Sequence, residues 1–287
     1  MPLTTRRLIA GFVAVACAGA IVGGGSVIYS WFHTAPPPIP PRSECRAHVA
    51  AGSATLSLEQ ASNATTIAAT ARRLGLPDHA VTVGIAAALQ ESRLHNLNYG
   101  DRDSLGLFQQ RPSQGWGTAE QIQQPVFAAT AFFTHLARID GWIDLPVNEA
   151  AQRVQRSGVP EAYAQWEPKA RIIADALTGE TPAAFSCRFR NADRFPAAAP
   201  LVTALVTELG DAPLDHATTA KAGWLAAQWL VAHAPEHDIT AVSFAGHRWT
   251  PSTDRWSETG AAGQTAATGS RLHVTLRACA STRTGCR

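Results

Sequence analysis

Charged residues are scarce in this chain. They make up 16% of its 287 residues, whereas apolar residues make up 46%. This composition excludes the intrinsically disordered class, whose chains combine few apolar residues with many charges. The length is sufficient for two small domains in addition to a membrane-proximal segment.

A strong excess of positive charge is also absent. The net charge is +2, and no lysine or arginine cluster is interleaved with aromatic residues. Nucleic-acid surfaces usually carry a basic patch, and single-strand binders add aromatic rings that stack on bases. We therefore expect no nucleic-acid partner.

An uncharged, mostly apolar run of 25 residues extends from Leu8 to Phe32, directly after Arg6 and Arg7. A membrane-spanning helix needs roughly 20 such residues. The next charge is Arg42, so the positive-inside rule places the N-terminus in the cytoplasm. We expect residues 1–33 to form a single transmembrane anchor in the cell membrane, with the following domains extracytoplasmic.

Two other fates of this segment stay open. The small residues Ala18, Gly19 and Ala20 are compatible with cleavage of a signal peptide, and Cys17 is a weak match to a lipoprotein site. The apolar character that resumes from Ile21 favours the uncleaved anchor. All three alternatives export the rest of the chain.

Export bears on the cysteines, because thiols outside the cytoplasm tend to pair. Cys45 and Cys187 flank the central region, and Cys279 and Cys286 are close together in sequence. A bond between Cys45 and Cys187 would close a long loop and stabilise the fold by up to about 5 kcal/mol. Four cysteines allow three pairings, so the connectivity stays open. None has metal-ligand spacing, and we expect no metal.

The remaining sequence predicts a mainly α fold, in which a helical domain is followed by a small α+β domain after the N-terminal transmembrane helix. A proline-rich linker occupies residues 34–44. The helical domain covers residues 45–187, and the α+β domain covers residues 190–287. Periodicity and turn residues predict helices at 59–74, 78–91, 125–139, 148–156, 161–177 and 219–234, and strands at 239–244 and 272–276.

One pair of motifs points to chemistry. Glu91-Ser92 ends a predicted helix, and Gly106-Leu107-Phe108-Gln109 follows after a loop rich in Asn, Gly, Asp and Ser. This arrangement resembles the soluble lytic transglycosylases and goose-type lysozymes of the lysozyme superfamily, with Phe108 where methionine is usual. The resemblance implies a lysozyme-like domain that cleaves peptidoglycan glycan strands. It also implies Glu91 as the catalytic residue, with substrate-binding residues at Ser92, Gly106, Leu107, Phe108, Gln109, Gln155 and Tyr163.

Glycosidic cleavage requires a proton for the leaving oxygen, and burial keeps a carboxyl protonated near neutral pH. In the resembling group one glutamate acts as acid and then as base, so no second carboxylate is needed. Asp101 and Asp103 are alternatives that would orient a water molecule, although we expect both to form turns. Gln109 is a candidate for binding an acetamido group. Trp116 and Trp142 are candidates for sugar stacking or for the core.

The chain departs from the family at one position. The group carries a tyrosine that supports the catalytic glutamate, and Gln155 stands in its place here. We expect Gln155, or Tyr163 from the next helix, to hydrogen-bond the Glu91 carboxyl. The departure leaves open a non-catalytic peptidoglycan-binding or scaffolding protein.

The C-terminal region faintly resembles a module of exported actinobacterial cell-wall proteins that is related to zinc peptidases. His216 and His273 are candidate ligands, but no aspartate partner accompanies them. A wall-binding module is therefore expected, with a zinc peptidase as the alternative. Together these patterns predict a membrane-anchored, cofactor-free, peptidoglycan-cleaving enzyme whose partners are glycan strands and the membrane.

Overall fold

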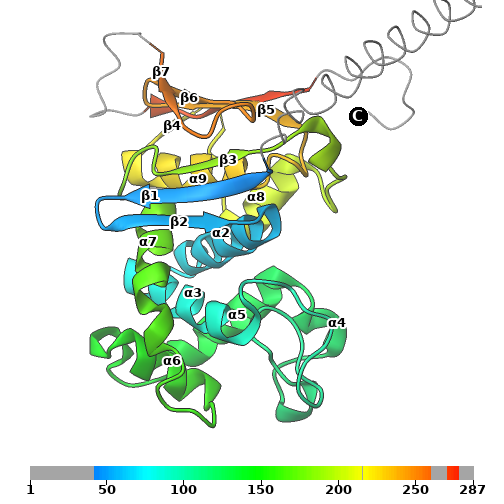
Figure 1. Cartoon of the computed structure of the whole chain (residues 1–287), viewed down its shortest axis with the longest axis vertical. Helices are drawn as coiled ribbons and strands as arrows, with labels where there is room; N and C mark the ends of the chain where they lie inside the picture. Colours follow the sequence, from blue (N-terminus) through cyan, green and yellow to red (C-terminus); the bar gives the residue numbers. More distant parts are fainter. Residues whose placement is uncertain (1–41, 215, 260–269, 278–287) are drawn as a thin grey trace, which may run out of the picture. The chain divides into compact units, whose positions relative to one another are not determined.

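The computed structural model describes residues 42–214, 216–259 and 270–277 (Figure 1). The predicted transmembrane segment 1–33, most of the linker, and Cys279 and Cys286 lie outside the described residues. Within these ranges, no helix has the length and apolar character that crossing a membrane requires. The membrane anchor stays a prediction.

A three-stranded antiparallel sheet opens the described chain (Figure 1). Its central strand β1 pairs on one side with β2 and on the other with β3, which comes from far along the sequence. Side chains of β1 alternate between the core and solvent, with Cys45, Ala47 and Val49 buried. The strands are β1 (Glu44–Val49), β2 (Gly52–Leu56) and β3 (Phe185–Arg188).

Helices pack below this sheet around α3, which contacts α2, α5, α6 and α7. Every residue from Ala80 to Leu89 is buried, so α3 is covered on all sides. Helix α2 begins at Ser57, which forms a capping box with Gln60. The helices are α2 (Leu58–Arg73), α3 (Asp78–Ser92), α4 (Ala119–Ile122), α5 (Pro125–Leu136), α6 (Val147–Gln155) and α7 (Glu167–Leu177).

The described C-terminal residues add two helices and a second antiparallel sheet, with strand order β7-β6-β5-β9. Helix α9 packs against this sheet through β5 and also against α2 and β3. A short pair, β4 with β8, lies beside them. The elements are α8 (Leu201–Leu209), β4 (Ala217–Thr218), α9 (Ala220–Ala232), β5 (Ile239–Phe244), β6 (His247–Trp249), β7 (Ser257–Glu258), β8 (Ser270–Arg271) and β9 (His273–Leu276).

The prediction of a mainly α fold with a small α+β domain after it is wrong. Strands occur at both ends of the described chain, and the protein from residue 42 onward forms one compact α+β unit. The physical reason lies in α9, where all residues from Gly223 to Ala232 are buried. A helix that is apolar on every side needs cover on every side, and α2 provides it together with β5.

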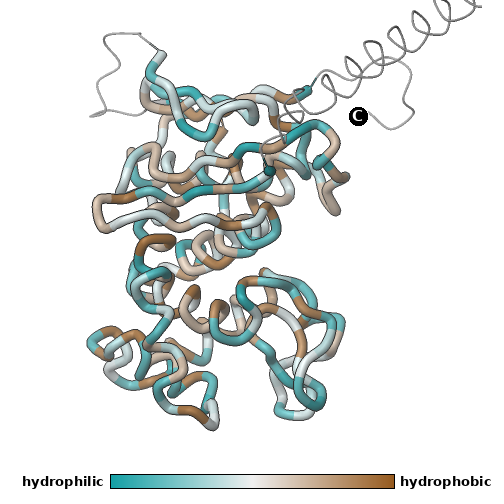
Figure 2. The backbone as a smooth tube through the Cα atoms, in the orientation of Figure 1, coloured by the Kyte–Doolittle hydropathy of each residue, from teal (hydrophilic) through white to brown (hydrophobic). Residues whose placement is uncertain are grey.

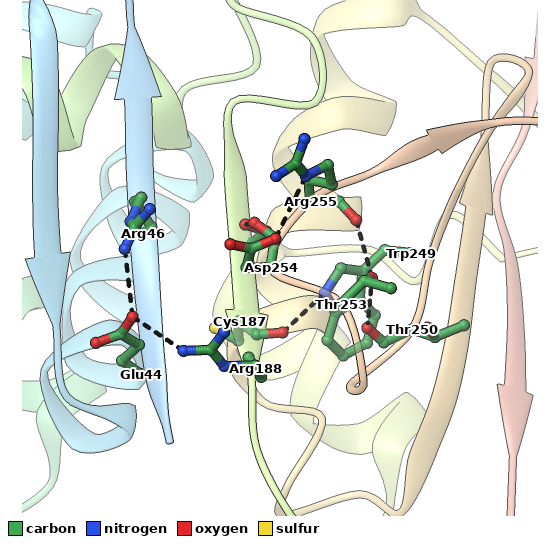
Figure 3. Close-up of polar contacts among 10 residues, drawn as sticks. Glu44, Arg46, Cys187, Arg188, Trp249, Thr250, Thr253, Asp254 and Arg255 are labelled. Carbon is green, nitrogen blue, oxygen red and sulfur yellow. Dashed lines mark hydrogen bonds and ion pairs between the residues drawn. The ribbon is translucent and has the colours of Figure 1, made fainter. Parts of the chain in front are cut away.

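Of the pairings that the sequence left open, the structure contains the bond between Cys45 and Cys187. The two cysteines are register partners in β1 and β3, with their Cα atoms 3.9 Å apart. The Trp249 indole of β6 donates a hydrogen bond of 3.0 Å to the Cys187 carbonyl oxygen (Figure 3). The Trp256 indole donates one of 2.8 Å to the Phe185 carbonyl oxygen. Strand β3 therefore joins the first sheet to the C-terminal elements.

Candidate active site

Glu91 lies in the last turn of α3, whose residues from Ala80 to Leu89 are all buried. The helix ends at Arg93, whose backbone adopts the left-handed conformation with φ of 57°. Ser92 and Leu89 are buried, whereas Glu91 is half-buried. The buried helix therefore fixes the backbone of Glu91, and the residue itself is only partly exposed.

Tyr163 supplies the closest partner of this carboxyl group. Its hydroxyl donates a hydrogen bond of 2.6 Å to Glu91 Oε1, and its side chain is fully buried. The Tyr163 backbone N–H donates to Asn148 Oδ1 at 3.1 Å, which ties the segment after α6 to the start of that helix. Position 155 is a glutamine, and the phenol that hydrogen-bonds Glu91 belongs to Tyr163.

Burial raises the pKa of Glu91 above its ordinary value. The hydrogen bond from Tyr163 and a weaker interaction with the Gln155 amide act in the opposite direction, but burial dominates. Burial and the neighbouring Glu91 carboxylate also raise the pKa of Tyr163, which keeps the phenol protonated. The pair therefore combines a carboxyl that holds its proton at higher pH with a permanent hydrogen-bond donor.

Gln155 connects Glu91 to the turn that follows it in the motif. It is the last residue of α6, and its amide Nε2 donates a hydrogen bond of 2.8 Å to the Phe108 carbonyl oxygen. The same amide lowers the pKa of Glu91. Gln155 thus interacts with both the carboxyl group and the turn.

The turn itself is closed by two backbone hydrogen bonds between Leu105 and Gln110, of 2.9 and 3.0 Å. Gly106 has a φ of +74°, and its N–H donates to the Leu97 carbonyl oxygen at 2.7 Å. A Cβ atom at this position would lie 2.7 Å from the Ile122 carbonyl oxygen. Both the backbone conformation and the close approach require glycine.

Replacing Gly106 with alanine should lower the free energy of unfolding by about 2 kcal/mol or more, because it adds steric overlap to backbone strain. Gly115→Ala is a matched control. Gly115 also has a positive φ, of 81°, but its Cβ would meet nothing within 4 Å, so we expect a cost of about 1 kcal/mol. Urea unfolding of both variants measures the difference, and equal losses would contradict the close-approach argument.

The other motif side chains are mainly structural. Ser92 donates to the Leu107 carbonyl oxygen at 2.7 Å and is buried. Leu107 and Phe108 are buried too, and Phe108 stacks on Phe132 with ring centroids 4.6 Å apart. Gln109 donates to backbone carbonyl oxygens of its own loop. These side chains shape the turn.

Asp101 and Asp103, the two carboxylates of the loop after Glu91, interact with other residues of that loop. Asp103 accepts hydrogen bonds from Arg111 Nε at 2.7 Å and from the Ser113 backbone N–H at 2.8 Å. Hydrogen bonding from the Ser113 side chain and backbone, followed by that from Arg111, holds the pKa of Asp103 well below its usual range. The Asp101 side chain is 92% exposed and lies beside Arg102. Asp103 therefore stabilises the loop between α3 and α5, which is largely hydrophilic (Figure 2).

A polar cleft of about 670 Å³ reaches Gln155. Trp116 lies in its wall, tilted against His135 with ring centroids 4.2 Å apart. Trp142 instead stacks on His79, with ring centroids 6.0 Å apart, and packs on the core. Of the two tryptophans considered for sugar stacking, Trp116 is the one that lines this cleft. The lining residues are Gln114, Trp116, His135, Arg138, Ile139, Arg153, Val154, Gln155 and Arg156.

A second polar cluster near Glu91 was not expected from the sequence. The Gln90 side-chain oxygen accepts hydrogen bonds from the Trp166 indole at 2.8 Å and from the Gln165 amide at 3.2 Å. The Arg93 guanidinium lies 3.9 Å from the centroid of the Trp166 ring. The only sequence signal for this cluster is its adjacency to Glu91 and Tyr163.

The described part of the chain contains no group of side chains that would support the alternative of a zinc site. His216 lies against the Leu214 carbonyl oxygen, and His273 belongs to β9. Among residues 42–214, 216–259 and 270–277, no three histidine, cysteine, aspartate or glutamate side chains gather to hold a metal ion.

No protein-family model and no curated protein matches the sequence.

Proposed function

We propose that this protein cleaves the glycan strands of peptidoglycan outside the cytoplasm, with Glu91 as its single acid and base. The observation that carries the proposal is the pairing of Glu91 with Tyr163 at the end of a buried helix. The substrate class comes from the motif resemblance to lytic transglycosylases and goose-type lysozymes. The disulfide between Cys45 and Cys187 supports an oxidising compartment.

The chemistry follows from the protonation state of Glu91. The protonated carboxyl gives its proton to the leaving oxygen as the glycosidic bond breaks. The resulting carboxylate then accepts a proton from the nucleophile, which is either the C6 hydroxyl of the same sugar or a water molecule. Tyr163 stabilises the carboxylate between these steps, because it donates a hydrogen bond to Glu91 Oε1.

Mass spectrometry of the products formed from purified sacculi tests the proposal. Fragments with 1,6-anhydro ends indicate a lytic transglycosylase, and fragments with reducing ends indicate a hydrolase. A protein that sediments with sacculi but releases no fragments would be the non-catalytic scaffold, which the glutamine at position 155 favours. That result would overturn the proposed activity.

Tyr163→Phe is expected to move the alkaline limb of the pH–rate profile to higher pH and to lower the maximal rate about tenfold. The hydrogen bond from Tyr163 favours the ionised form of Glu91, so its removal raises the pKa of Glu91. The base step then lacks its stabilising donor. Rates of fragment release between pH 4 and pH 9 measure both effects.

The matched control is Tyr99→Phe. Tyr99 is 68% exposed, and we expect the profile of this variant to coincide with that of the wild type. A Tyr163→Phe profile with an unmoved alkaline limb would contradict the assignment of Tyr163 as the partner that tunes Glu91.

A further inference from the structure

The polar cleft that reaches Gln155 is lined by cations and, among the described residues, by no carboxylate. Arg138 comes from the segment after α5, and Arg153 and Arg156 come from the end of α6. His135 adds an imidazole ring to the same wall. A concave surface lined by charges of one sign concentrates ligands of the opposite sign.

Two of these arginines have no carboxylate partner in the described part of the chain. Arg153 pairs with Glu149 one turn earlier in α6. Arg138 and Arg156 are exposed, and no described aspartate or glutamate lies within ion-pair distance of either. Their positive charge is therefore available to a ligand.

One of these cations adjoins Gln155, the residue that interacts with Glu91. Arg156 directly follows Gln155 and ends α6 in the left-handed conformation, with φ of 53°. Gln155 donates to the turn after Glu91 and lowers the pKa of that glutamate. Gln155 therefore links Glu91 to the cleft that the arginines line.

We propose that this cleft binds the carboxylates of the peptides that peptidoglycan strands carry, so that the protein acts on peptide-bearing strands in preference to bare ones. This inference rests on the proposed function, because Glu91 positions the strand. A guanidinium donates two parallel hydrogen bonds to a carboxylate, which neither a sugar hydroxyl nor an acetamido group matches. Arg138 and Arg156 make these contacts, and Trp116 forms the apolar wall beside them.

Sedimentation with sacculi tests the inference through binding alone. The full-length Glu91→Gln protein is bound to intact sacculi and to sacculi whose peptides have been removed by an amidase. We expect about tenfold weaker binding to the stripped strands, with a difference that shrinks as salt is added. Arg138→Gln combined with Arg156→Gln should bind intact sacculi as weakly as stripped ones.

The matched control combines Arg248→Gln with Arg255→Gln. Both arginines are exposed and belong to the C-terminal sheet region, so this variant loses the same charge without touching the cleft. It should retain the tenfold preference. Thermal unfolding of both double variants verifies that they are folded.

Two results would overturn the inference. One is equal binding of the Glu91→Gln protein to intact and stripped strands, and the other is an Arg138 and Arg156 double variant that keeps the preference. Loss of binding only when phosphate polymers are extracted from the sacculi would also overturn it, in favour of a phosphate ligand. Because binding is measured without turnover, failure of the wild-type protein to release fragments would refute the proposed activity separately.

Discussion

Glu91→Gln should reduce the rate of fragment release from sacculi by about 10²- to 10⁴-fold, the usual contribution of a general acid. The amide matches the carboxyl group in shape, and its oxygen still accepts the hydrogen bond from Tyr163. It has no acidic proton to give to the leaving oxygen. Binding to sacculi should therefore be unchanged while cleavage is lost.

Glu258→Gln is the matched control, because it makes the same chemical change and removes the same charge at an exposed residue of β7. Its rate should equal that of the wild type. A Glu91→Gln protein that retains more than about a tenth of the wild-type rate would show that another group supplies the proton. Release that survives this substitution and stops with a chelator would instead identify a zinc peptidase.

The same substitution should change stability in a pH-dependent way. The pKa of Glu91 is raised in the folded state, so the folded protein binds this proton more tightly than the unfolded chain does. The wild-type free energy of unfolding therefore falls as pH rises from about 4.5 through the raised pKa. Glutamine does not ionise. The Tm of the variant relative to the wild type should increase between pH 4 and pH 8, and an unchanged difference would contradict the burial of Glu91.

The local parts of the site were predictable from the sequence. The helix that ends near Glu91 follows from apolar spacing, and the turn at Gly106 follows from a glycine where the chain must reverse. Tyr163 was only one of two candidate partners, because its contact with Glu91 depends on how α6 and α7 pack around α3. The spacing of residues along the chain does not contain that information.

The β-strands at the start of the fold were missed for a physical reason. In β1 the buried positions are occupied by Cys45, Ala47 and Val49, and alanine has low β propensity. Pairing with β3 is non-local, so no turn signal connects the two strands. The prediction of a separate C-terminal domain overlooked α9, whose apolar residues occupy every face between Gly223 and Ala232. Such a helix is covered on all sides, and here α2 covers one of them.

Replacing both Cys45 and Cys187 with alanine should destabilise the protein by up to about 5 kcal/mol, because the bond closes a loop across a sequence separation of 142. For a unit of this size the loss corresponds to a fall in Tm of about 10–20 °C. Each single alanine variant removes the bond as completely as the double variant. All three should therefore unfold at similar temperatures.

The effect should extend beyond the first sheet, because β3 also accepts hydrogen bonds from Trp249 and Trp256 of the C-terminal region. Freed from β1, this strand no longer holds both parts of the unit together. We expect the C-terminal tryptophans and the Tyr163 site to lose structure in one transition, at the same lowered temperature. Tryptophan fluorescence and fragment release, followed during heating with and without reductant, provide the measurement. A Tm lowered by less than about 3 °C, or a C-terminal region that unfolds separately in the wild type, would contradict this role of β3.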